Sequence, residues 1–117
     1  MFKPCPPLDP DLRPPLLRVP EGACDCHFHI FGPAMRYPYA DQRGYTPPDA
    51  PVEAYRRVMA ALGLQRCVIV QPSVYGTDNA CTLDAMARLG PGCRGIAVID
   101  ETVGEEALAD MNRAGIR

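Results

Sequence analysis

The sequence predicts an α/β fold built on a parallel sheet. Strand-like apolar segments and amphipathic helical segments alternate three times between residues 23 and 117, which is the pattern of successive β/α units. Gly63, Gly90 and Gly115 each follow a helical segment, so the pattern repeats after 27 and then 25 residues. The second strand has the aliphatic centre Val68-Ile69-Val70, as expected for a strand buried on both faces.

The first 22 residues are expected to form an extended arm. Proline lacks the N–H that a helix interior or a central strand needs, and seven prolines stand at positions 4, 6, 7, 10, 14, 15 and 20. Regular structure is therefore expected only in the remaining domain, residues 23–117.

Within that domain we predict strands at about 23–31, 66–71 and 94–99. Helices are predicted at 51–62, at 79–89 and from about 102 to 115. In the first helix, Tyr55, Val58, Met59 and Leu62 share one face.

Helix starts and core positions can also be predicted. Asp78-Asn79 is expected to cap the second helix, and Thr102-x-x-Glu105 resembles a capping box for the third. Core positions are assigned to Leu108 and to the methionines at 59, 86 and 111.

The composition limits the classes of partner. A formal net charge of −2 with scattered basic residues argues against a nucleic-acid partner. No apolar stretch approaches the roughly 20 residues that span a bilayer, and no secretory signal is recognised, so we expect a cytoplasmic protein without a membrane partner. The six cysteines are expected to be reduced and mostly buried. The oligomeric state stays open.

Both histidines of the chain stand in one short segment, Asp25-Cys26-His27-Phe28-His29. In an extended strand His27 and His29 would project from one face together with Asp25, while Cys24, Cys26, Phe28 and Ile30 would occupy the other. Two adjacent imidazoles can hold a metal ion or polarise a carbonyl oxygen. Asp25 lies deeper along the strand, so we expect it to be structural.

Three β/α units leave a sheet edge and one apolar face exposed, which native proteins avoid. We therefore expect the chain to be the N-terminal part of a larger enzyme. A complete small α/β sandwich remains the alternative.

Three segments carry a resemblance to a known family: DCHFHIFGP at 25–33, YTPPDAP at 45–51 and VQPSVYGTDN at 70–79. Together they resemble the amidohydrolase superfamily, most closely its 2-pyrone-4,6-dicarboxylate lactonase-like branch. The resemblance implies a TIM (β/α)8 barrel that is incomplete in this chain, with the active site at the carboxyl ends of the strands.

The resemblance also implies an activity and site residues. The expected protein is a hydrolase that opens a lactone or related ring of a small anionic carboxylate with activated water, and the truncated chain alone is expected to be inactive. His27 and His29 would be the catalytic pair, either binding a divalent metal (Zn²⁺ or Mn²⁺) or acting without one. Substrate contacts would come from Tyr45 and Ser73, with Tyr75, Thr77 and Asn79 lining the same loop. A zinc-dependent decarboxylase, a C–N hydrolase and a non-catalytic fragment remain alternatives.

Overall fold

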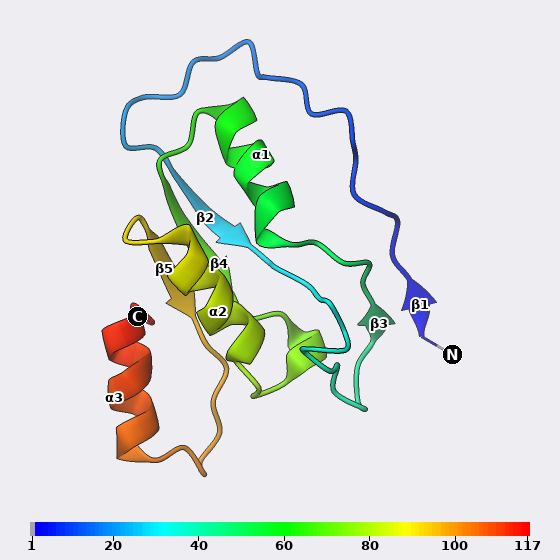
Figure 1. Cartoon of the computed structure of the whole chain (residues 1–117), viewed down its shortest axis with the longest axis vertical. Coiled ribbons are helices and arrows are strands. Elements are labelled where there is room, and N and C mark those ends of the chain that lie inside the picture. The colour runs from blue at the N-terminus through cyan, green and yellow to red at the C-terminus, as the bar shows by residue number, and fades with distance from the viewer. Residues whose placement is uncertain (1) are drawn as a thin grey trace.

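A computed structural model describes residues 2–117 and has a three-stranded parallel sheet at its centre (Figure 1). The strand order is β2-β4-β5, and all neighbours are parallel. The predicted α/β class with a parallel sheet is thus confirmed. The three strands are β2 (Cys24–Phe28), β4 (Arg66–Val70) and β5 (Cys93–Ile96).

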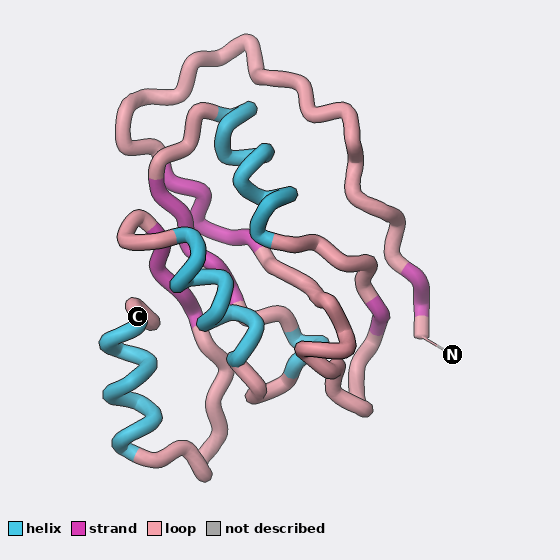
Figure 2. The backbone as a smooth tube through the Cα atoms, in the orientation of Figure 1, coloured by secondary structure: helices cyan, strands magenta, loops and turns pink. Residues whose placement is uncertain are grey.

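A helix follows each strand, and the helices are α1 (Val52–Leu62), α2 (Ala80–Leu89) and α3 (Glu105–Ala114). In Figures 1 and 2, α1 and α2 lie over the same face of the sheet. The shortest dimension of the molecule is 19 Å, which is the thickness of two layers. Ile69 is fully buried under the helices, whereas Val68 and Val70 alternate toward the other face and are half-buried.

The sheet continues beyond β5 for one more step. Ile116 forms a parallel bridge with Gly95, and the Arg117 N–H donates to the Gly95 carbonyl at 3.0 Å. Gly95 permits this approach because a Cβ there would lie 2.8 Å from Ile116 Cδ1 and would also meet the Met86 sulfur. This isolated bridge extends the parallel pairing of the sheet past β5.

The proline-rich arm runs around the outside of α1 in an extended path (Figure 1). Near its start, β1 (Lys3–Pro4) pairs in parallel with β3 (Tyr45–Thr46), which belongs to the long loop after β2. The sequence did not indicate this short strand pair. No described helix has the length and apolar character needed to cross a membrane.

Two local predictions for the third helix are wrong. Thr102 makes no capping box, because α3 begins after Gly104 and the Thr102 hydroxyl donates to Asp100 Oδ1 at 2.6 Å instead. Leu108 is 42% exposed, and α3 has no fully buried residue, because it lies beside the edge of the sheet rather than over its centre. Met86 is buried as predicted, at 3% exposure.

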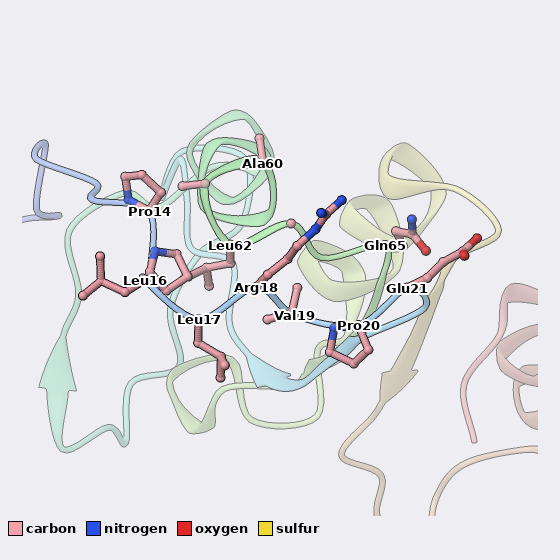
Figure 3. Close-up of a pocket in the computed structure, with 13 residues that line it drawn as sticks. Pro14, Leu16, Leu17, Arg18, Val19, Pro20, Glu21, Ala60, Leu62 and Gln65 are labelled. Atoms are coloured by element: carbon pink, nitrogen blue, oxygen red, sulfur yellow. The ribbon is translucent and has the colours of Figure 1, made fainter.

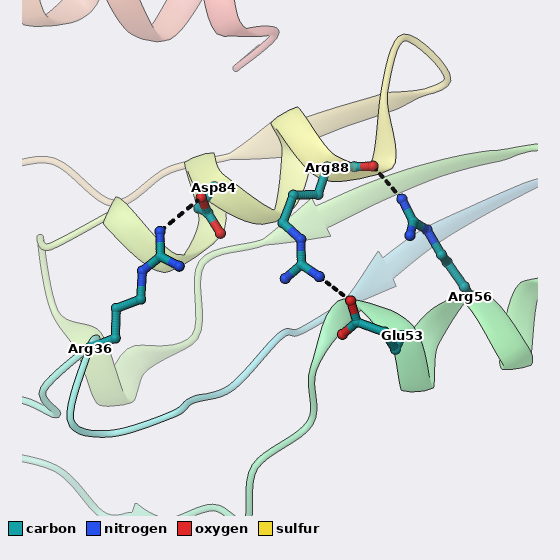
Figure 4. A network of polar contacts seen from close by, with 5 residues as sticks. All are labelled: Arg36, Glu53, Arg56, Asp84 and Arg88. Carbon is teal, nitrogen blue, oxygen red and sulfur yellow. Dashed lines mark hydrogen bonds and ion pairs between the residues drawn. The ribbon is translucent and has the colours of Figure 1, made fainter.

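Polar contacts join the two helices that cover the sheet (Figure 4). Arg88 of α2 pairs with Glu53 of α1, and Arg56 of α1 donates to the Arg88 carbonyl at 2.5 Å. Arg36, from the loop after β2, pairs with Asp84 of α2 at 3.4 Å. These groups are largely exposed, so each pair contributes little to stability.

The buried cysteines behave as small apolar residues. Cys67 and Cys93 face each other across β4 and β5, and both are 3% exposed. Burial raises the pKa of the Cys67 thiol to about 12, with a smaller contribution from the adjacent Cys93. Cys67 therefore stays protonated and unreactive at neutral pH.

Candidate active site

The two histidines lie side by side at the carboxyl end of β2. His27 is the penultimate residue of the strand and His29 follows its last residue. Their ring centroids are 5.1 Å apart, with the planes at 83°. His27 is exposed and His29 is half-buried. The structure thus brings the imidazoles together at the edge where the sequence places them.

A bulge in β2 changes the position of Asp25. Asp25 pairs with Cys67 and Phe28 with Ile69, so β2 uses one residue more than β4 over this interval. Asp25 therefore turns toward α1, where its Oδ2 accepts the Tyr55 hydroxyl at 3.0 Å. The prediction that Asp25 shares the face of the histidines is wrong, because strict alternation fails at the bulge.

His29 is oriented by the neighbouring strand. Its Nδ1 lies 2.8 Å from the Val70 carbonyl oxygen at the end of β4. A carbonyl can only accept, so Nδ1 carries the proton and donates. In the neutral ring Nε2 then holds a lone pair that is available as a metal ligand or a base.

The loop after β4 is held from inside by Gln71. Its Nε2 donates to the carbonyls of Gly76 (3.1 Å) and Asp78 (2.8 Å), and its Oε1 accepts the Thr82 hydroxyl at 2.5 Å. Gln71 is only 4% exposed. It was not predicted as a site residue, although a polar residue directly after a buried strand was a usable signal.

Ser73 and Thr77 are exposed on the loop that Gln71 holds. Ser73 begins a short 3-10 helix, Ser73–Tyr75. Both residues follow β4, which is parallel to β2, so they lie at the edge of the sheet where the carboxyl ends of both strands meet.

Asn79 connects this loop to the segment after β5. It occupies the N-cap position of α2, as predicted, but its side chain makes no capping bond. Instead, its Nδ2 donates to the carbonyls of Thr77 (2.9 Å) and Val98 (2.8 Å), and its Oδ1 accepts the Val98 N–H at 3.0 Å. Asp78 Oδ1 accepts the Ala80 N–H at the helix start. Asn79 is thus a buried connector of two loops.

The two tyrosines of the predicted site differ in position. Tyr75 is 3% exposed, its hydroxyl accepts the Gly32 N–H at 2.8 Å, and its ring stacks on Tyr39. Burial raises the pKa of Tyr75, so its hydroxyl remains protonated. Tyr45 lies on β3, apart from the main sheet, and packs half-buried against the core.

Two cavities lie between the arm and α1. A cavity of about 210 Å³ is bounded by Leu8 and Leu12 of the arm, by Ala54 and Val58 of α1, and by His29. A second cavity, of about 580 Å³, lies near the opposite end of α1, between arm residues 14–21 and residues 60–65 (Figure 3). Of these two cavities, only the smaller is lined by a histidine, which is His29.

The spacing of the imidazoles fits two ligands of one metal ion. Two imidazoles that share one zinc ion, each about 2.0–2.1 Å from it, must lie next to each other. The observed separation is 5.1 Å, and the bond from His29 to Val70 leaves Nε2 available. Among residues 2–117, no three His, Cys, Asp or Glu side chains lie close enough to hold a metal ion together. The pair can therefore form part of a ligand set.

The chain is similar in sequence to proteins named as lactone hydrolases. Over 97 residues the chain is 44% identical to the 4-sulfomuconolactone hydrolase of Hydrogenophaga intermedia, covering 83% of this chain and 32% of that protein. It is 36% identical over 103 residues to the 2-pyrone-4,6-dicarboxylate hydrolase of Comamonas testosteroni, covering 88% and 34%. The chain thus spans about a third of the length of these relatives.

A solved structure is similar over most of the chain. It is that of a probable 2-pyrone-4,6-dicarboxylic acid hydrolase of Acinetobacter baumannii with citric acid bound. The TM-score is 0.75 at 27% identity, covering 81% of this chain and 35% of that one. The amidohydrolase family model matches residues 24–117, from the start of β2 to the last residue, and the chain belongs to the amidohydrolase family.

Proposed function

We propose that this chain forms the first three β/α units of a (β/α)8 barrel and carries part of the active site of a lactone hydrolase. The observation that carries the proposal is the imidazole pair at the carboxyl end of β2, in a chain 44% identical to a 4-sulfomuconolactone hydrolase. The carboxyl ends of barrel strands surround the active site. Since the chain spans a third of its relatives, later strands would supply the remaining catalytic groups.

Opening a lactone with water has two requirements. Water must lose a proton to a base, and negative charge that develops on the carbonyl oxygen must be stabilised. We assign His27 and His29 to the carbonyl side of this reaction. A neutral His29 offers Nε2 as a ligand, whereas a protonated His29 offers it as a hydrogen-bond donor to the developing oxyanion.

Either state of the pair is compatible with a catalytic role. With Zn²⁺ or Mn²⁺ bound, His27 and His29 would be two of the ligands, and the ion would contribute Lewis acidity and a more acidic water. Without a metal, protonated imidazoles would polarise the carbonyl directly. Dialysis of the whole enzyme against a chelator separates the two routes: retained turnover supports the second, and loss that either metal restores supports the first.

The proposed substrate is a small anionic carboxylate. We assign Ser73 and Tyr45 as hydroxyl donors to its carboxylate, with the exposed Thr77 of the Ser73 loop as a further contact. Tyr75 receives a supporting role, because its hydroxyl is buried against the Gly32 N–H.

A chimera tests the proposal. This chain replaces the matching third of the Hydrogenophaga intermedia 4-sulfomuconolactone hydrolase, and the hydrolysis of 4-sulfomuconolactone and 2-pyrone-4,6-dicarboxylate is measured. We expect turnover of at least one lactone. A chimera that melts cooperatively but hydrolyses neither would refute the proposal, while decarboxylation or C–N cleavage by the same chimera would favour the other reactions.

A further inference from the structure

Tyr55 of α1 contacts both ends of the bulge in β2. Its hydroxyl donates to Asp25 Oδ2 at 3.0 Å, and its ring stacks on Phe28 with centroids 3.6 Å apart and planes 2° apart. Asp25 and Phe28 are the residues between which the strand register changes. Cys26 and His27 lie between these two contacts, so one helix side chain brackets the segment that carries the first histidine.

Asp25 connects the tyrosine to the histidine. Asp25 Oδ2 accepts a hydrogen bond from the Tyr55 hydroxyl, and Asp25 Oδ1 accepts one from the backbone N–H of His27 at 3.0 Å. Hydrogen bonds to an ionised acceptor are roughly twice as strong as neutral ones. Tyr55 is 7% exposed, so little water competes for its hydroxyl.

The bulge determines which way His27 projects. A strand that loses a bulge shifts by one residue, and a one-residue shift exchanges the faces on which side chains lie. His29 does not depend on this device, because the Val70 carbonyl holds its ring from β4. The two imidazoles are therefore oriented by separate contacts.

We infer that Tyr55, acting through Asp25, is a positioning residue that holds His27 in its orientation. The inference rests on the proposed function, in which His27 takes part in lactone opening. A purely structural Tyr55 would stabilise the core without acting selectively on His27.

Hydrogen exchange of the 117-residue chain tests the positioning directly. The chain contains only two histidines, so labelling with ¹⁵N-histidine gives separate NMR signals for His27 and His29. In Tyr55→Phe, which keeps the ring stacked on Phe28, we expect the His27 amide to exchange about tenfold faster while the His29 ring signals stay unchanged. Asp25→Asn, which keeps the side-chain size, should act in the same direction.

Tyr37→Phe is the matched control. Tyr37 is also buried, and its hydroxyl lies near Asp84 of α2 and makes no hydrogen bond to Asp25 or His27. Equal His27 exchange rates in the Tyr55 and Tyr37 variants would overturn the inference and leave Tyr55 as a core residue only.

The chimera supplies the kinetic test. Tyr55→Phe should lower kcat about tenfold and leave KM within about twofold, because only the orientation of a catalytic group changes. An unchanged kcat would overturn the positioning role. A chimera that opens no lactone even with Tyr55 intact would refute the proposed function instead, and the exchange measurement would still decide the inference because it needs no turnover.

Discussion

Replacing Asn79 with alanine is expected to lower the free energy of unfolding by about 1.5–3 kcal/mol. The Asn79 side chain is 4% exposed and makes three hydrogen bonds, two of them to the backbone of Val98. A net intramolecular hydrogen bond contributes about 0.5–1.5 kcal/mol, so three sum to roughly 1.5–4.5 kcal/mol. Val98 is 41% exposed, so in the variant water can replace part of the hydrogen bonding that its backbone loses. The lower half of this range therefore applies.

Urea unfolding followed by circular dichroism measures this loss. For a chain of this size the change corresponds to a fall in Tm of roughly 6–12 °C. Thr77→Ala, an exposed substitution in the same loop, is the control and should stay within about 0.5 kcal/mol of the unmodified chain. If Asn79→Ala also lost less than about 0.5 kcal/mol, the idea that its side chain secures the two loops would be refuted.

Three further predictions concern the site, the core and pH. In the chimera, His27→Ala should lower kcat by at least about 10²-fold and leave the melting temperature unchanged because the side chain is exposed; near-normal turnover would remove His27 from the mechanism. Gly95→Ala should lower the free energy of unfolding by about 1–3 kcal/mol in a thermal melt, because the new Cβ would lie 2.8 Å from Ile116 Cδ1. In the control Gly44→Ala the new Cβ meets nothing within 4 Å, so stability should change little. The pKa of Cys67 rises on folding from its ordinary value of 9.0 to about 12. The contribution of this thiol to the free energy of unfolding should therefore be constant below about pH 9 and fall toward pH 12. The prediction is contradicted if the urea midpoint of Cys67→Ala falls as steeply with pH as that of the unmodified chain.

The pattern of apolar residues and the glycines that end the helices predicted the main strands and helices of the fold. The aliphatic centre Val68-Ile69-Val70 marks the middle strand of the sheet, and the glycines after the helices tolerate left-handed backbone. Gly63 and Gly115 both take that conformation, at φ 72° and 102°. These features need no information from distant residues.

The site was harder to predict where distant residues decide the outcome. The register with β4 changes between Asp25 and Phe28, and Tyr55 of α1 contacts both residues, so alternation alone placed Asp25 on the wrong face. Asn79 was expected to cap a helix because asparagine often does, but its side chain instead bonds to the backbone of Val98, 19 residues away. The adjacency of His27 and His29 was predictable because two-residue spacing survives beyond the bulge.

The prolines of the arm have an energetic consequence for the whole chain. Each proline ring fixes one backbone dihedral before folding, so the unfolded arm samples fewer conformations and loses less entropy when it is laid along α1. Exchanging the seven prolines for glycine would keep the length of the arm but increase the conformational entropy that the arm loses on folding. The prolines therefore restrict the backbone conformations of the arm already in the unfolded chain, before it contacts α1.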